Sequence, residues 1–239
     1  MDLKPDNKQL FKRAALSTAC LLSGFLFMQF LQWVFIFTGS YLSDFQGNIK
    51  WHDFIFYATA KQWNFKQVLS LFLLPDLVFF IMYLVLSIRK KRFVDKPVLF
   101  HLFYSWFYLL LTVRVLFLPL WQIVDKNGVY YALSWLRISR TEQLITGMVL
   151  MTVYLLTVFR ISTMFSSGLM VQTKRFLNKK IILPQLIFLW LIPFLVFTLL
   201  LFFFSGNQIS FPNNYLIGGV AFILLVNIPV ISNYKVIVN

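Results

Sequence analysis

Long apolar runs, separated by short polar stretches rich in lysine and arginine, divide this chain. Six runs reach the roughly 18–25 residues that an apolar helix needs to cross about 30 Å of hydrocarbon. They cover residues 14–38, 68–88, 97–124, 141–160, 181–205 and 214–232. Backbone groups inside hydrocarbon must be satisfied within the segment, and the alternation of a barrel strand is missing. The pattern predicts an all-α integral membrane protein, a compact bundle of six transmembrane helices.

A shorter helix is predicted between the first two runs. Its apolar positions recur at i, i+3, i+4 and i+7, the spacing of one helix face. These positions are Trp51, Phe54, Ile55, Ala58, Gln62 and Phe65. The pattern indicates an amphipathic interfacial helix in the first outer loop. A short lid packed on the bundle explains the same spacing equally well.

The basic residues predict the orientation. Of the 22 lysines and arginines, 15 lie in residues 1–13, the 89–96 loop, the 160–180 stretch and the tail 233–239, and six lie on the opposite side. Cytoplasmic loops carry this excess, so both termini are predicted to be cytoplasmic. The net charge of +14 is expected to meet anionic lipid headgroups on that side rather than nucleic acid.

Composition supports the membrane assignment. Only 13% of the residues are charged, about half of what a soluble domain of this size carries. The lone Cys20 excludes an internal disulfide. No glycosylation sequon with a permitted middle residue is present. These features are consistent with a multi-pass protein of a bacterial inner membrane.

Four polar side chains are predicted to share one depth in the membrane. Asp76 and Arg114 lie about 12 and 15 Å inside the outer ends of their runs, and Gln29 and Gln32 about 13 and 9 Å inside theirs. We expect a buried ion pair between Asp76 and Arg114, with further hydrogen bonds from both glutamines. Such a pair fixes helix register, or it forms an outward-facing polar pocket for a proton or an anionic headgroup.

A second polar feature follows one face of the third run. Five side chains fall within a 100° arc of a helix: His101, Tyr104, Ser105, Tyr108 and Thr112. A stripe of this kind lines a cavity or joins two helices, and the helix–helix contact is the favoured interpretation.

Known catalytic and cofactor motifs are missing. His52 and His101, the two histidines, are predicted to lie on opposite sides of the membrane, so they cannot share a metal or a haem. No zinc-protease, serine-elbow, Walker or dinucleotide motif occurs. We therefore expect no cofactor and no metal site.

The composition of the runs favours one class of function. Only 9 of 239 residues are glycine, whereas 29 are phenylalanine. Transporters that rock about a central site tend to have helices broken by glycine and proline. The sequence therefore favours a non-enzymatic subunit or scaffold of a larger membrane assembly. The alternative is a small permease with a pocket around Asp76 and Arg114, and a membrane enzyme acting on a lipid substrate comes third.

Overall fold

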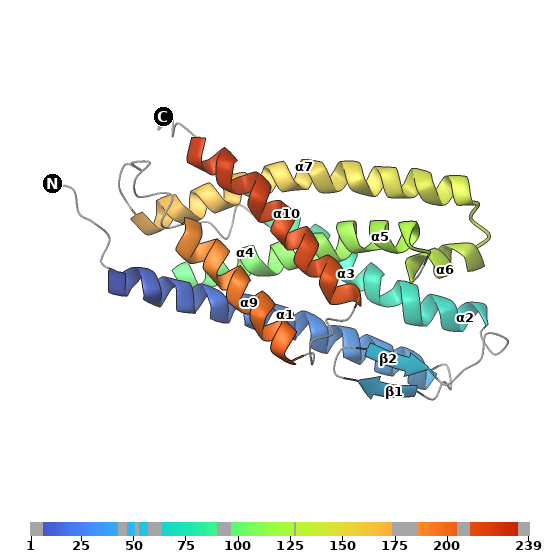
Figure 1. Ribbon diagram of the computed structural model, residues 1–239. Helices are drawn as coiled ribbons and strands as arrows, with labels where there is room; N and C mark the ends of the chain where they lie inside the picture. Colours follow the sequence, from blue (N-terminus) through green and yellow to red (C-terminus); the bar gives the residue numbers. More distant parts are fainter. Residues whose placement is uncertain are drawn as a thin grey trace.

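The computed structural model describes residues 7–42, 47–50, 53–56, 64–89, 97–126, 128–173, 186–204 and 211–233. Helices form most of this part of the chain (Figure 1). The α-helices are α1 Asn7–Leu42, α2 Phe65–Val68, α3 Leu74–Arg89, α4 Val98–Thr112, α5 Leu118–Val124, α6 Val129–Trp135, α7 Arg140–Thr173, α9 Ile192–Phe204 and α10 Phe211–Asn233. Three π-helical turns continue into them: η2 Leu69–Leu73, η4 Val113–Phe117 and η5 Ile187–Leu191.

Five of the predicted spans correspond to helical segments of sufficient length and hydropathy. These segments are Leu10–Tyr41, Leu69–Ile88, Val98–Val124, Arg140–Ile161 and Ile187–Phe204. Helix α10 occupies the sixth predicted position, but its described apolar stretch, Leu216–Asn227, is shorter. Several long apolar helices thus fit a polytopic membrane protein. The number of spans and their place in a bilayer stay predictions.

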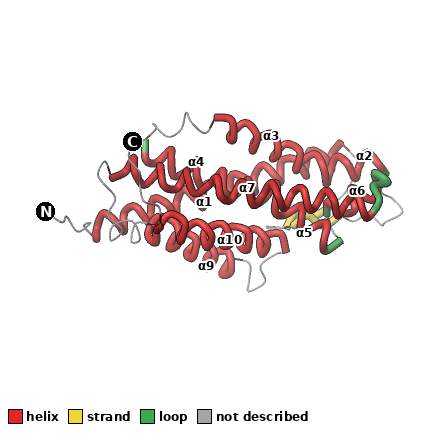
Figure 2. The backbone as a smooth tube through the Cα atoms, turned by 90° about the horizontal axis from the view of Figure 1, so that it is seen from above, coloured by secondary structure: helices red, strands yellow, loops and turns green. Residues whose placement is uncertain are grey.

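The third span, formed by α4, η4 and α5, lies at the centre of the bundle. It contacts α1, α3, α7 and α10 around its circumference, and Figures 1 and 2 show it enclosed among them. In its best apolar window 72% of the residues are buried, against 24–28% in the other spans. Side chains such as Trp106 and Leu110 are fully buried. A helix that is apolar on every face behaves in this way when other helices surround it.

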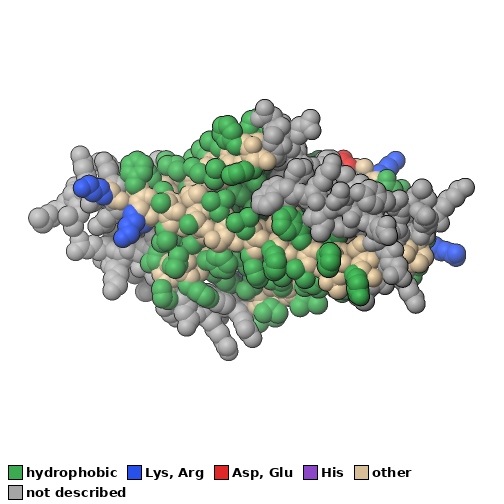
Figure 3. Space-filling model, turned by 90° about the horizontal axis from the view of Figure 1, so that it is seen from below, with side chains coloured by type: hydrophobic (Ala, Val, Ile, Leu, Met, Phe, Trp, Pro, Cys, Tyr) green, Lys and Arg blue, Asp and Glu red, His purple; other side chains and the backbone are tan. Residues whose placement is uncertain are grey.

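The surrounding helices expose large apolar side chains. Leu156 on α7 is 67% exposed, and Phe203 on α9 is 73% exposed. Figure 3 shows one such face, where apolar side chains cover the middle and the visible lysines and arginines lie at the two ends. A soluble monomer rarely exposes a continuous apolar area of this extent, so the surface suits lipid or protein contact.

Each described π-helical turn precedes a proline. The prolines are Pro75, Pro119 and Pro193. The residue just before each of them donates its N–H to the carbonyl five residues back: Leu74 to Leu69, Leu118 to Val113 and Ile192 to Ile187. A proline inside a helix has no N–H and its ring crowds the carbonyl four residues back. A wider turn relieves that crowding, which lets the apolar helix continue across the proline.

The predicted interfacial helix is wrong where the structure describes the segment. Two antiparallel strands, β1 Gly47–Lys50 and β2 Asp53–Phe56, pair with Gly47 opposite Phe56 and Lys50 opposite Asp53. Phe54 and Ile55 therefore belong to a strand, and Phe65 begins α2. Aromatic and β-branched residues favour strands, and this local preference outweighed the helical spacing. Trp51, Ala58 and Gln62 lie outside the described residues.

Candidate functional site

Asp76 and Arg114 meet between the second and third spans. Nη2 of Arg114 lies 3.3 Å from Oδ1 of Asp76, and the side chains are 12% and 20% exposed for Arg114 and Asp76. The guanidinium carbon also lies 5.5 Å from the centre of the Phe79 ring. Among the described residues one guanidinium nitrogen, Nη2, reaches the carboxylate. Nε of Arg114 is buried without a hydrogen-bond partner.

Both members of the ion pair sit beside a π-helical turn. Arg114 is the second residue of η4, and Asp76 lies in the first turn of α3, directly after η2. A π turn inserts one extra residue and so rotates the side chains on either side of it relative to an unbroken helix. Such turns are frequent at functional sites and hinges. The prolines thus help to set the direction from which the two charges approach each other.

The two predicted glutamine partners do not join this pair. Gln29 and Gln32 are partly buried on α1, and neither hydrogen-bonds to Asp76 or Arg114 in the part of the chain that the structure describes. Helix α1 reaches the pair through Phe35 instead, whose ring contacts Phe79 edge-on at 6.4 Å. The position of a residue along its helix follows from residue counts, but the direction of its side chain depends on how the helices pack.

All five residues of the polar stripe on α4 are buried. Tyr104 donates to the carbonyl of Leu86 on α3 at 2.6 Å, and the Tyr108 hydroxyl lies 3.1 Å from Oγ of Ser87. The remaining stripe residues bond within α4: Thr112 donates to the carbonyl of Tyr108 at 2.8 Å, and Oγ of Ser105 lies 3.4 Å from Nδ1 of His101. The stripe therefore joins helices, as the favoured interpretation required, and its groups are largely used within the protein.

The contact extends to a third helix. Tyr83 on α3 stacks on Tyr108 with ring centres 5.5 Å apart, and its hydroxyl lies 3.1 Å from Oγ1 of Thr157 on α7. We call Tyr83, Ser87, Tyr104, Tyr108 and Thr157 the tyrosine seam. Sequence reasoning missed its members on α3 and α7. Tyr83 and Ser87 lie four residues apart on one face of α3, a short signal that could have indicated the contact.

A second buried polar contact ties three helices on the opposite face of α4, at the same level as the tyrosine seam. Nε1 of Trp106 donates to Oγ of Ser17 at 2.8 Å, and Ser17 in turn donates to the carbonyl of Leu189 at 2.5 Å. Leu189 lies four residues before Pro193, so its carbonyl is the one that the proline cannot satisfy. Ser17 on α1 therefore supplies the hydrogen bond that the Leu189 carbonyl cannot receive from Pro193.

No metal centre is found among the described residues. No group of three or more histidine, cysteine, aspartate or glutamate side chains could hold an ion there. His101 is buried beside Ser105, and His52 lies outside the described residues.

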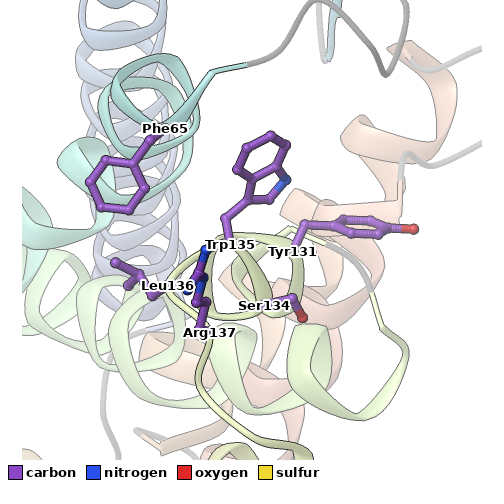
Figure 4. A pocket seen from close by; sticks show the side chains of 6 residues that line it. All are labelled: Phe65, Tyr131, Ser134, Trp135, Leu136 and Arg137. Carbon is purple, nitrogen blue, oxygen red and sulfur yellow. The ribbon is translucent and has the colours of Figure 1, made fainter.

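A pocket of about 680 Å³ opens at the end of the bundle that carries the hairpin. Its lining comes from the first residue of α2, from α6 and from the turn after α6: Phe65, Tyr131, Ser134, Trp135, Leu136 and Arg137. Figure 4 shows Phe65 facing the α6 residues across the opening, with the Arg137 side chain running between Leu136 and Trp135. We call it the α6 pocket. The sequence marked Phe65 alone, since α6 is too short to stand out between two spans.

No protein-family model, no curated protein and no solved structure matches this chain. The fold therefore brings no function with it, and a function can be inferred only from the residues described above.

Proposed function

We propose that this polytopic membrane protein is a non-enzymatic subunit or scaffold that docks onto other membrane proteins. The tyrosine seam carries the proposal. Three polar side chains of α4 bond to neighbouring helices: Tyr104 and Tyr108 bond to residues of α3, and Trp106 bonds to Ser17 of α1. Interhelical hydrogen bonds of this kind hold a bundle in one arrangement. Polar groups committed to one arrangement are poorly suited to binding a passing substrate.

The outer surface supports the same proposal. Wide apolar strips on α7 and α9, including Leu156 and Phe203, are available to lipid or to another helix. Bulky residues dominate these strips, and bulky residues suit fixed contacts better than sliding motion. In this proposal the partners are other membrane subunits.

The test is the size of the particle that the protein forms. Purified from its native membrane in a mild detergent, the 28.3 kDa chain should migrate in a complex with defined additional subunits, at a fixed ratio after crosslinking in the membrane. The same chain expressed alone in a foreign membrane is the control and should give a smaller particle. A single 28.3 kDa chain from both sources would count against the subunit function.

A small permease is the second candidate, and one observation favours it. Asp76 is 20% exposed at its side chain, and Nε of Arg114 is buried without a partner. A pair that leaves hydrogen-bonding capacity unused has room for an anion or a proton to bind. The two functions predict different outcomes for substitutions of this pair, as argued in the Discussion.

For the orientation, we propose both termini in the cytoplasm of a bacterial cell, with the α6 end facing outward. The excess of lysine and arginine on the terminal side supports this placement. Lys126 lies exposed in the turn after α5, and Lys12 lies exposed near the start of α1. With Cys20 replaced by serine, Lys126→Cys should react with an impermeant maleimide in intact cells. Lys12→Cys should react only after the cells are opened, and the reverse pattern would overturn the orientation.

A further inference from the structure

The α6 pocket lies at the level where the apolar spans begin. Phe65 precedes the second span, which starts at Leu69, by four residues, and Arg137 precedes the fourth span, which starts at Arg140, by three. The four helical residues 65–68, at a rise of 1.5 Å each, place Phe65 about 6 Å beyond the start of the second span. In a bilayer that is the depth of the lipid headgroups, where tryptophan and tyrosine are enriched. Lipid headgroups are therefore the most abundant ligand available to a pocket at this depth.

Arg137 adopts a backbone conformation that arginine rarely takes. Its φ is +58°, in the left-handed region. Its N–H donates to the carbonyl of Ser134 at 3.0 Å, and the N–H of Ile138 donates to the carbonyl of Leu133 at 3.1 Å. These two bonds form the Schellman ending of a helix, in which Arg137 takes the position usually occupied by glycine. The left-handed conformation is unfavourable for a residue with a Cβ.

The described residues make no use of the charge on Arg137. Its guanidinium makes no hydrogen bond or ion pair within the part of the chain that the structure describes. The other two arginines nearby are engaged: Arg140 bonds to the carbonyl of Ile123 at 2.8 Å, and Arg114 pairs with Asp76. Arginine is therefore present at a strained position, in a pocket, with its donors available. A planar guanidinium binds phosphate with two parallel hydrogen bonds.

We propose that the α6 pocket binds the headgroup of an anionic phospholipid, with the phosphate on Arg137. Phe65, Trp135 and Leu136 provide the apolar wall for the start of the acyl chains. The pocket volume of about 680 Å³ falls within the range of ligand sites, roughly 300–1,000 Å³. The guanidinium of Arg137 selects against zwitterionic lipids, whose own ammonium group would lie close to the arginine. This site is on the end opposite to the basic termini, and it is independent of the proposed subunit function.

The test compares Arg137→Gly with Lys126→Gly in the intact chain. Lys126 is exposed at the same end of the bundle and also has a positive φ, +56°, but it does not line the pocket. Both variants remove one positive charge and place glycine where glycine is favoured, so both should fold with an unchanged or higher melting temperature. Native mass spectrometry in detergent then measures the affinity for dioleoylphosphatidylglycerol.

Wild type and Lys126→Gly should bind this lipid alike, and Arg137→Gly should bind it at least about tenfold more weakly, since one hydrogen-bonded charge is lost. Phe65→Ala, on the opposite wall, should weaken binding severalfold. Dioleoylphosphatidylcholine should bind wild type less tightly than the anionic lipid. Inorganic phosphate should not displace the lipid, because it cannot use the apolar wall. Equal losses in both glycine variants, or equal affinity for the two lipids, would overturn the proposal, and displacement by free phosphate would do so as well.

Discussion

Neutralising Asp76 or Arg114 alone should destabilise the protein more than neutralising both. In the variant Asp76→Asn, Arg114 stays charged and largely buried without its carboxylate, 3.3 Å away in the native pair. A lone charge left in such surroundings costs several kcal/mol. The double variant Asp76→Asn/Arg114→Gln leaves no lone charge, so part of the lost melting temperature should return. Thermal unfolding in detergent of the four proteins measures the coupling directly.

Gln32→Leu is the matched control for this cycle. Gln32 lies at a similar predicted depth on α1 but bonds to neither charge, so its replacement should leave the pair and the melting temperature nearly unchanged. Losses that simply add in the double variant would show that the two charges are not coupled. The double variant also separates the two candidate functions. If the double variant folds but its cell loses the phenotype of the native protein, the result favours the permease function over the subunit function, because a purely structural pair is replaceable.

The spans were predictable because their signal is summed over about twenty residues. A run such as Val98–Val124 is long and apolar, and its polar stripe could be read from the sequence through the fixed 100° step of a helix. Depth within a span follows from the 1.5 Å rise in the same way, which explains why Asp76 and Arg114 could be paired in advance. These quantities depend on one helix at a time.

Contacts between helices were less accessible. Gln29 and Gln32 share the predicted depth of the Asp76–Arg114 pair. The residue of α1 that reaches the pair is Phe35, whose ring contacts the Phe79 ring beside Arg114. Which face of α1 meets α3 depends on the packing of the whole bundle, and a count along one helix cannot supply it. The same reason hid Thr157, the partner of Tyr83 in the tyrosine seam.

Short elements were the least predictable from the sequence. Five apolar positions and Gln62, at helical spacing in 51–65, predict a helix, yet β2 forms at Asp53–Phe56. Over so few residues, helical spacing and strand preference compete on nearly equal terms. Helix α6 has seven residues, and its apolar run is too short to distinguish a helix from a strand. The α6 pocket, built from such pieces, could not be found before the fold was known.

Helix α10 should tolerate added volume poorly at Gly219, where it packs tightly against η4. Helix α10 packs against η4 at Gly219, where a methyl group would lie 2.5 Å from Cγ1 of Val113 and 3.0 Å from Cδ1 of Phe117. The carbonyl of Gly219 also accepts a hydrogen bond from Tyr154 at 3.0 Å. A shift of α10 away from η4 would strain that bond. The contact involves the same π turn that holds Arg114, so a disturbance here reaches the ion pair.

Gly219→Ala should therefore lower the free energy of unfolding by about 1–3 kcal/mol, the usual effect of overpacking. Gly218→Ala is the control on the same helix, since a methyl group there has nothing within 4 Å. Alanine is the better helix former by up to about 1 kcal/mol, so this control should be neutral or slightly more stable. Val113→Ala removes both methyl groups that lie nearest to Gly219 and should rescue part of the loss in a double variant with Gly219→Ala. Thermal unfolding in one detergent measures all of these, and equal melting temperatures for the two single glycine variants would contradict the close packing of α10 on η4.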